Sequence, residues 1–272
     1  MRFPRIATIL VLASCAALAA CERERERAPT ANDAQVAAAP AQAVVELQDV
    51  VETRPDYIVG ISYPKSANGH PALAHALQAY AEAARADLMK AVAGLQGRKP
   101  TAPYDLSLQF TGLVDTPQVV AIAADGSSYT GGAHGNPLVA RFVWLPQRQE
   151  MLKAEALVAD ASGWQAISDA CREQLMTALS QRLDADEVEG ADRANQLKNG
   201  SRMIDDGIRP DPQNFAQFEP VMNAEGQIRA IRFVFPPYQV GPYVDGTRTV
   251  ELPARALLPH IVPGYRKLFQ GG

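Results

Sequence analysis

The chain has 272 residues, 47% of them hydrophobic and 21% charged, which is ordinary for a globular protein that buries a core. This length accommodates one large domain or two small ones. The net charge is −4, and without Arg2 and Arg5 of the N-terminal leader 24 basic residues stand against 30 acidic ones, which gives −6. Such a chain offers no basic face, so we expect no nucleic-acid partner.

The N-terminus is typical of a bacterial lipoprotein signal. Two arginines precede an apolar stretch, 6–20, that is too short to cross a bilayer comfortably, and Leu18-Ala-Ala-Cys21 resembles a lipobox. We therefore predict a signal peptide over 1–20 and a lipid on Cys21, which attaches the protein to a membrane. The alternative is an ordinary signal peptide that happens to precede a cysteine. Glu22 is not the aspartate that signals inner-membrane retention, so by analogy we expect a periplasmic protein anchored in the outer membrane.

The segment after this cysteine has almost nothing to bury. It alternates charges and then consists mostly of Ala, Pro, Gln and Thr, so we predict a disordered tether over 21–43. Of the three cysteines, one leaves with the signal and one carries the lipid. Cys171 is then alone, no internal disulfide is possible, and packing must hold the core together.

The first half of the folded chain, 44–150, combines strands with one helix. Pro71 suits the first turn of this helix, and apolar residues recur behind it at steps of three and four as far as Gly94 and Gly97. Runs rich in β-branched and aromatic residues predict the strands, which we place at 44–51, 57–63, 104–113, 118–124 and 138–145.

In the second half, 151–272, Ser162 and Gln165 form a capping box that predicts the start of a second helix. Cys171 lies in the apolar stripe of that helix, so we expect a buried, inert thiol. The polar segment 184–212 predicts only a short helical piece, around Met203. Three strands at 215–222, 227–235 and 247–252 and a short helix at 253–260 follow.

Strands and helices are grouped along the chain and do not strictly alternate. This order predicts an α+β fold with mainly antiparallel sheet and two long amphipathic helices, in which the two halves pack into one unit.

No pattern in the chain predicts a metal or cofactor site. His70 and His75 are five residues apart, which puts them on different sides of a helix, and neither belongs to an H-E-x-x-H motif. There is no G-x-S-x-G nucleophile elbow and no phosphate-binding glycine loop. We therefore expect neither a metal nor a cofactor.

Two glycine-bearing loops remain as candidate sites. The stretch 128–136 has three glycines that permit positive φ and close backbone approach, with His134 among them. Either this stretch is a hairpin or bulge in which His134 only packs, or the histidine is catalytic.

The second loop, 236–246, is rich in proline and bears Tyr238 and Tyr243. Prolines reduce flexibility and tyrosines offer flat amphipathic surfaces, so such a loop can bind a protein or a sugar at low entropic cost. The opposite interpretation, with both tyrosines folded into the core, is about equally supported. Their odd spacing places them on opposite faces of an extended chain, whereas a turn at Gly241-Pro242 brings both to one tip.

Both loops resemble a known family. Ser128-Tyr-Thr-Gly-Gly-Ala-His-Gly-Asn136 resembles the recurrent motif of the extracytoplasmic domain shared by the anti-sigma factor RsiV and the deacetylase PdaC. Phe233-Val-Phe-Pro-Pro-Tyr-Gln-Val-Gly-Pro-Tyr-Val-Asp-Gly246, followed by Thr249-Val-Glu-Leu-Pro253, resembles the second half of the RsiV-like domain. The resemblance implies an α+β unit with a PdaC-like half over 44–150 and an RsiV-like half over 151–272.

RsiV-like proteins bind lysozyme through this domain, and the resemblance implies a binding protein of the cell envelope whose partner is lysozyme or peptidoglycan. Neither anti-sigma nor deacetylase activity carries over, because the matching residues include no sigma-binding segment and no metal-binding catalytic domain. We expect the two loops to supply the ligand contacts through Tyr129, His134, Tyr238, Pro242 and Tyr243. The alternative function is an envelope enzyme that acts on peptidoglycan and is centred on His134.

Overall fold

A computed structural model describes residues 45–272. The predicted signal peptide, the lipidated Cys21 and the tether lie outside these residues. Within the described part of the chain, no helix is both long enough and apolar enough to cross a membrane.

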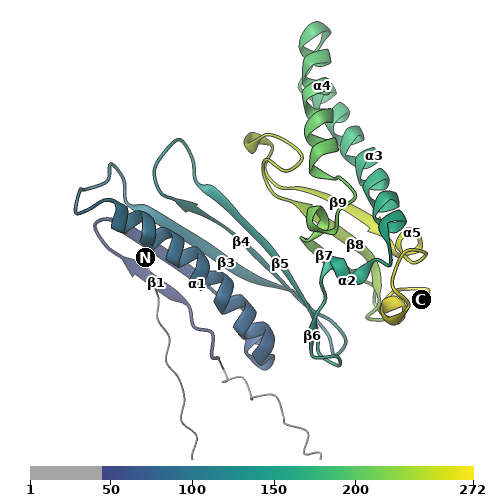
Figure 1. The fold of residues 1–272 in the computed structure, drawn as a ribbon, viewed down its shortest axis with the longest axis horizontal. Helices are drawn as coiled ribbons and strands as arrows, with labels where there is room; N and C mark the ends of the chain where they lie inside the picture. The colour runs from purple at the N-terminus through teal and green to yellow at the C-terminus, as the bar shows by residue number, and fades with distance from the viewer. Residues whose placement is uncertain (1–44) are drawn as a thin grey trace, which may run out of the picture. The chain divides into compact units, whose positions relative to one another are not determined.

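The first half forms a six-stranded sheet whose strands follow one another in chain order (Figure 1). All neighbouring strands are antiparallel except β2 and β3, which are parallel. This pair needs a crossover, which a short 3-10 helix (Lys65–Gly69) and α1 (Pro71–Gly94) provide. The strands are β1 (Val50–Thr53), β2 (Tyr57–Ser62), β3 (Tyr104–Asp115), β4 (Val120–Tyr129), β5 (Asn136–Leu145) and β6 (Glu150–Met151).

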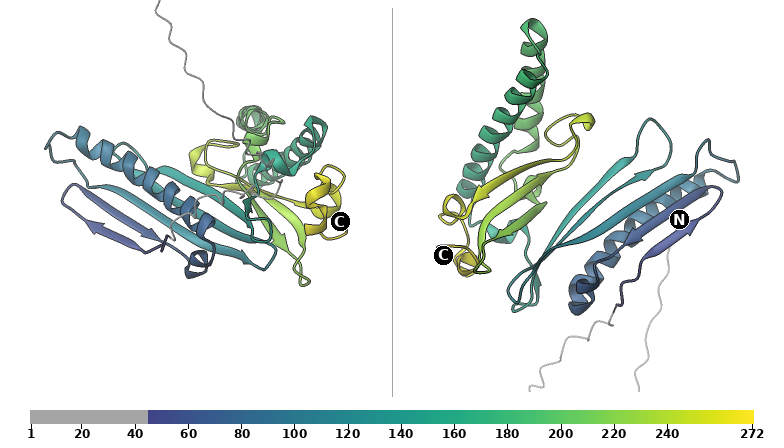
Figure 2. Two further views of the ribbon diagram at one scale, coloured as in Figure 1. Left: turned by 60° about the horizontal axis from the view of Figure 1, so that its bottom comes forward. Right: turned by 180° about the vertical axis from the view of Figure 1, so that it is seen from behind.

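Helix α1 lies along one face of this sheet (Figure 2). Its buried leucines, Leu73, Leu77 and Leu88, repeat near the helical period, and Pro71 occupies the first turn. Alternate residues of the strands turn toward the helix, as period-two side-chain alternation requires, and form a core with it. That core includes Val59, Ile61, Leu106, Leu108, Phe110, Val120, Ile122, Ala124 and Trp144.

The second half builds a smaller antiparallel sheet covered by helices. Its strands are β7 (Phe218–Met222), β8 (Ile228–Phe235) and β9 (Arg248–Pro253). Helix α2 (Ala154–Leu157) and the long α3 (Ala161–Ala185) precede them, α4 (Gly190–Gly207) runs back along α3, and α5 (Ala254–Leu257) follows β9 (Figure 1). The apolar stripe of α3 packs on the sheet, and Trp164 stacks on Phe215, the last residue of a short 3-10 helix before β7, with ring centroids 5.4 Å apart.

The two halves share a core. Val143 and Leu145 of β5 face away from α1 and belong to the same buried cluster as Trp164, Phe233 and Leu252 of the second half. The predicted α+β fold with mainly antiparallel sheet is therefore confirmed, and the hairpin between β7 and β8 turns at Asn223–Gly226, as expected.

Three local predictions were wrong. The cap of α3 is Asp160 and not Ser162: the Asp160 carboxylate accepts the Gly163 N–H at 2.9 Å and the Ser162 hydroxyl at 2.6 Å. The hydrogen bond from that hydroxyl, with the one from the backbone, lowers the pKa of Asp160. Aspartate before the first turn satisfies the same free N–H groups as a serine cap.

The other two errors concern element lengths. Helix α4 has 18 residues where only a short piece around Met203 was expected. Tertiary contact stabilises this polar sequence, because Gly200 lets α4 approach Leu179 of α3 so closely that an added Cβ would lie 2.6 Å from that side chain. The first strand is Val50–Thr53 and not 44–51. Leu47 is buried, and its N–H donates to Asn68 Oδ1 at 2.8 Å and not to a neighbouring strand.

Candidate functional site

The glycine-rich stretch forms the connection between β4 and β5. Strand β4 continues to Tyr129 and β5 begins at Asn136, so the reversal occupies 130–135. Gly131 and Gly132 take positive φ angles of 98° and 102°, which side chains with a Cβ rarely adopt. The Tyr129 hydroxyl donates to the Gly132 carbonyl at 3.2 Å and so braces the loop from within. This is the hairpin that the sequence suggested.

His134 is an exposed residue of this loop. Its Nδ1 lies 3.1 Å from the Gly135 carbonyl oxygen, which can only accept a hydrogen bond. The neutral imidazole therefore carries its proton on Nδ1 and leaves Nε2 as an acceptor.

The connection between β8 and β9 is held from beneath by two polar side chains. The Gln239 amide donates to the Gly207 and Asn214 carbonyls, both at 2.8 Å. The Asp245 carboxylate, which is 9% exposed, pairs with Arg182 of α3 and with Arg248 at 3.2 Å. These bonds fix both ends of the loop to the helices and to β9.

Between these anchors, the loop turns tightly at Tyr238. The Tyr238 N–H donates to the Gly241 carbonyl at 3.0 Å, and Tyr238 takes a φ of 73°, which is unusual for a residue other than glycine. The tyrosine side chain is 54% exposed, and Val244 at the tip is 87% exposed. A rigid backbone thus presents apolar side chains to solvent.

The two loops meet through three rings. The imidazole of His134 stacks on Tyr243 with centroids 4.0 Å apart and planes inclined by 16°. The Tyr238 hydroxyl is 3.0 Å from His134 Nε2, the free acceptor, and the Tyr238 and Tyr243 rings lie 5.6 Å apart. We call these three residues the aromatic cluster. A turn at the second loop brings its two tyrosines together, as the sequence suggested.

The remaining predicted contacts lie beside this cluster. Pro242 is exposed next to Tyr243, and the Tyr129 hydroxyl is used within its own loop. Cys21 lies outside the described residues. Sequence reasoning missed Gln239, Asp245 and Val244, although all three lie in the loop 236–246. Gln239 and Asp245 are polar residues within a stretch rich in proline and tyrosine, and this contrast could have indicated that their side chains hold the loop to the rest of the fold.

The aromatic cluster can bind a ligand and can exchange protons with it. Ring faces, two hydroxyls and one imidazole can stack on a ligand and hydrogen-bond to it. Within residues 45–272, no carboxylate is bonded to His134, and no group of histidine, cysteine and acidic residues is placed to hold a metal ion.

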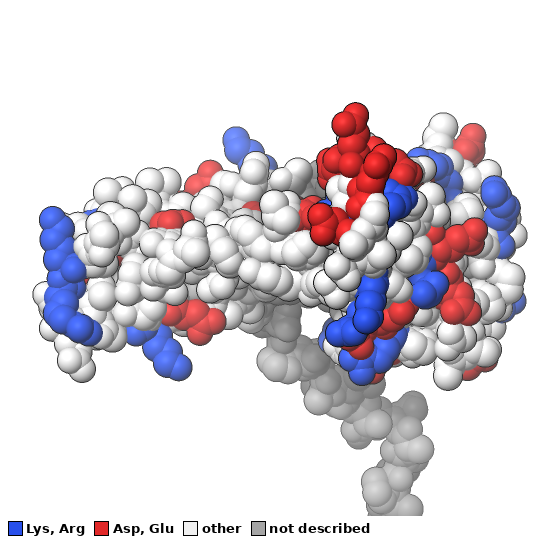
Figure 3. Space-filling model, turned by 90° about the horizontal axis from the view of Figure 1, so that it is seen from above, with Lys and Arg blue, Asp and Glu red and all other residues white. Residues whose placement is uncertain are grey.

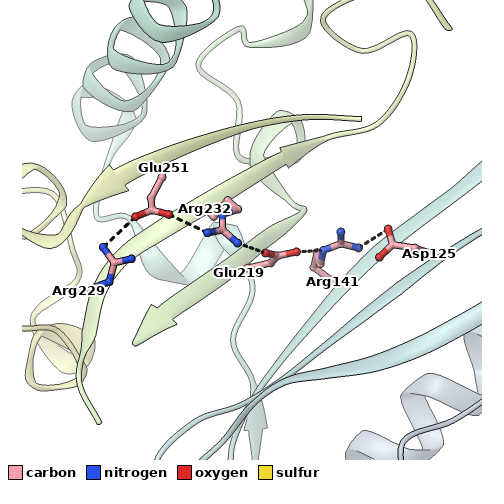
Figure 4. Close-up of polar contacts among 6 residues, drawn as sticks. All are labelled: Asp125, Arg141, Glu219, Arg229, Arg232 and Glu251. Carbon is pink, nitrogen blue, oxygen red and sulfur yellow. Dashed lines mark hydrogen bonds and ion pairs between the residues drawn. The ribbon is translucent and has the colours of Figure 1, made fainter. Parts of the chain in front are cut away.

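A row of ion pairs, buried only at Arg141 and Glu219, forms a second link between the sheets (Figure 4). Arg141 of β5 is 7% exposed and lies 2.6 Å from Glu219 of β7, which is 11% exposed, and 3.0 Å from Asp125. The row continues from Glu219 to Arg232, from Arg232 to Glu251 and from Glu251 to Arg229, at 3.4, 3.0 and 3.1 Å. The β4–β5 loop and the β8–β9 loop both connect strands that carry these ion pairs. The ion pairs therefore help to fix the distance between the two loops.

Comparison with known proteins relates this chain to one family of unknown function. A family model described as "Protein of unknown function (DUF3298)" matches residues 157–255, a stretch that includes Tyr238 and Tyr243 but not His134. No curated protein matches.

Two solved structures are similar. One is a DUF3298 family protein from Pseudomonas aeruginosa PAO1, 17% identical, with a TM-score of 0.53; the match covers 83% of this chain and 96% of that one. The other is a member of the same family from Bacteroides fragilis NCTC 9343, 16% identical, with a TM-score of 0.46 and coverage of 80% and 93%. The C-terminal part of this chain is thus similar to the DUF3298 family, and its fold is shared with the Pseudomonas protein.

Proposed function

We propose that this protein is a lipid-anchored binding protein of the bacterial envelope and that the aromatic cluster contacts its ligand, with lysozyme as the first candidate and peptidoglycan as the second. The observation that carries the proposal is the meeting of His134 with Tyr238, 104 residues away in the chain, at the surface of the molecule. Both stretches that resemble the RsiV-like domain meet at this point. The lipid on Cys21 and the outer-membrane address rest on the N-terminal sequence.

The physical properties of the cluster suit recognition. Tyrosines with few rotatable bonds supply contact area at low entropic cost, and the anchors at Gln239 and Asp245 remove most of the remaining freedom of the loop. Tyr238 and Val244 expose apolar surface, and a ligand that covered this surface would gain binding free energy. The net charge of −6 also favours encounter with a cationic protein, a description that fits a typical lysozyme.

Binding of labelled lysozyme, measured by fluorescence anisotropy at moderate salt, tests the proposal. Tyr238→Ala and Tyr243→Ala should each weaken binding about 30-fold, the effect of losing an aromatic hot spot worth about 2 kcal/mol. Leu113→Ala is the matched control, since Leu113 is an exposed apolar residue of β3 outside both loops. It should leave affinity unchanged.

Several results would contradict this. Absence of binding at tens of micromolar removes lysozyme, and co-sedimentation with insoluble peptidoglycan then tests the second candidate with the same variants. Tyrosine variants that bind as tightly as the wild type would place the binding face elsewhere. Thermal melting of each variant separates lost contacts from lost structure: a large fall in melting temperature with unchanged affinity of the folded fraction would make the loop part of the scaffold.

One observation favours the alternative, an enzyme acting on peptidoglycan. The Tyr238 hydroxyl and His134 Nε2 are within hydrogen-bond distance, and such a pair can transfer a proton. This alternative requires that purified protein change the muropeptide profile and that His134→Ala abolish the change with the fold intact. Unaltered muropeptides with the wild-type protein, or full activity of the variant, would reject it.

A further inference from the structure

A groove of about 390 Å³ lies between α1 and the first strand, and the aromatic cluster contributes none of its lining residues. Its lining is apolar in part, from Leu47, Val50, Ile61 and Ala81. The ring of Tyr63 also lines it and is held in place by stacking on Phe110, with centroids 4.7 Å apart.

The polar lining of the groove has an excess of negative charge. Arg85 of α1 lies 2.8 and 3.0 Å from the two oxygens of Glu52, so that pair is neutral. Glu46 and Glu82 also line the groove, and neither forms a salt bridge among residues 45–272. Burial, together with the carboxylates of Glu82 and Asp49, raises the pKa of Tyr63 to about 12.

Among residues 45–272, no further strand pairs with the sheet edge that borders the groove. Strand β1 is the outermost strand, and Val51 is 83% exposed. The N–H of Arg54 donates to the Tyr57 carbonyl, and hydrogen-bonded pairs alternate in an antiparallel ladder, so Glu52 and Val50 bond to β2. The N–H and C=O groups of Val51 and Thr53 therefore face outward, where another strand can pair with them.

Side-chain alternation connects this edge to the groove. Val50 and Glu52 of β1 line the groove on the side of α1. A strand that paired with β1 would place every second side chain on the same side, over the groove.

We propose that the edge of β1 and this groove bind an extended cationic peptide. Its backbone pairs with Val51 and Thr53, and a lysine or arginine side chain lays its aliphatic stem on Leu47 and Val50 while its charge lies between Glu46 and Glu82. The opposite charge selects this occupant, since a neutral or acidic strand would leave the two carboxylates uncompensated.

A labelled, end-capped peptide of about six alternating lysine and valine residues, the usual length of a strand, is the probe. Its binding to the full protein is followed by fluorescence anisotropy in about 0.15 M salt, where charges more than about 8 Å apart are largely screened. The double variant Glu46→Gln/Glu82→Gln should bind at least about tenfold more weakly, because both carboxylates at the groove lose their charge.

The matched control removes the same charge elsewhere. Carboxylates gather at the tip of the α3–α4 hairpin (Figure 3), where Glu187 and Glu189 are exposed. Glu187→Gln/Glu189→Gln should change the affinity by less than about twofold if binding is local. A peptide with N-methyl groups on the residues that pair with β1 should also bind the wild-type protein at least about tenfold more weakly, because methylation removes the ladder hydrogen bonds.

Three outcomes would overturn the proposal. Equal losses in both double variants would mean attraction to net charge alone. Equal binding of the N-methylated peptide would exclude strand pairing, and this measurement uses only the wild-type protein, so it stands even if a variant is unstable. No binding of the plain peptide at about 1 mM, where the free energy of binding is about −4 kcal/mol, would exclude the site altogether.

Discussion

Cys171 lies in the middle of α3, and its side chain is fully buried in the core that the two halves share. Burial raises the pKa of the Cys171 thiol to about 12. The thiolate is the reactive form, so this residue contributes packing and no chemistry in the folded state. Because the unfolded thiol ionises at lower pH, the folded state loses stability as the pH rises from about 9 toward 12.

We therefore expect Cys171 to resist alkylation at pH 8 in the native protein. Only about one thiol in ten thousand is ionised there, and the core also blocks access. Iodoacetamide labelling, quantified on the peptide that contains Cys171 by mass spectrometry, should be slow without denaturant and fast in urea. Rapid labelling of the native protein would show that α3 detaches from the sheet.

At the scale of elements, the α3–α4 hairpin supports the tyrosine loop. The last residue of α4, Gly207, passes so close to that loop that an added Cβ would lie 2.0 Å from the carbonyl oxygen of Gln239. The Gln239 side chain also bonds back to the Gly207 carbonyl. The end of the helix and the base of the loop therefore form one contact, which requires a glycine.

Gly207→Ala should destabilise the protein by about 1–3 kcal/mol, because backbone must move to make room. Gly94→Ala is the control: Gly94 also ends a helix, and nothing lies within 4 Å of its added Cβ. That change should leave stability equal or raise it by up to about 1 kcal/mol through helix propensity. Urea denaturation followed by circular dichroism measures both, and equal midpoints for the two variants would mean that α4 does not contact the loop.

Elements with a strong local signal could be predicted from the sequence. Pro71 and the leucine repeat located α1, and the Asn223–Gly226 turn located the β7–β8 hairpin. Helix α4 could not be predicted, because its 18 residues include few apolar ones and its stability depends on contact with Leu179. The cap of α3 was misplaced because Asp160 and Ser162 are both good caps, two residues apart.

At the scale of the whole molecule, the candidate site depends on how the two sheets pack. Each loop could be recognised from its own residues, and a turn could place Tyr238 near Tyr243. The approach of His134 could not be predicted, because it requires the packing of β5 against β7 and the buried contact between Arg141 and Glu219. Neither of these residues stands out in the sequence.

The shared core predicts that the described halves unfold together. The chain has two tryptophans, one in each half: Trp144 is buried in the core beneath α1, and Trp164 belongs to α3 and is buried in the core shared by the two halves. In Trp144→Phe and in Trp164→Phe, fluorescence of the remaining tryptophan should follow the same urea transition as the far-ultraviolet circular dichroism. A fluorescence transition at lower urea in either variant would show that one half unfolds without the other.

The left-handed backbone conformation of Tyr238 reduces the stability of the fold. A residue with a Cβ in that conformation costs about 1–2 kcal/mol, which glycine avoids. The same loop contains two glycines: Gly246 takes a positive φ of 67°, whereas Gly241 stands where Asp245 comes close and its φ is not positive. A tyrosine at 238 therefore costs stability that a glycine would not, which is the cost expected of a residue that contacts the ligand under the proposed function.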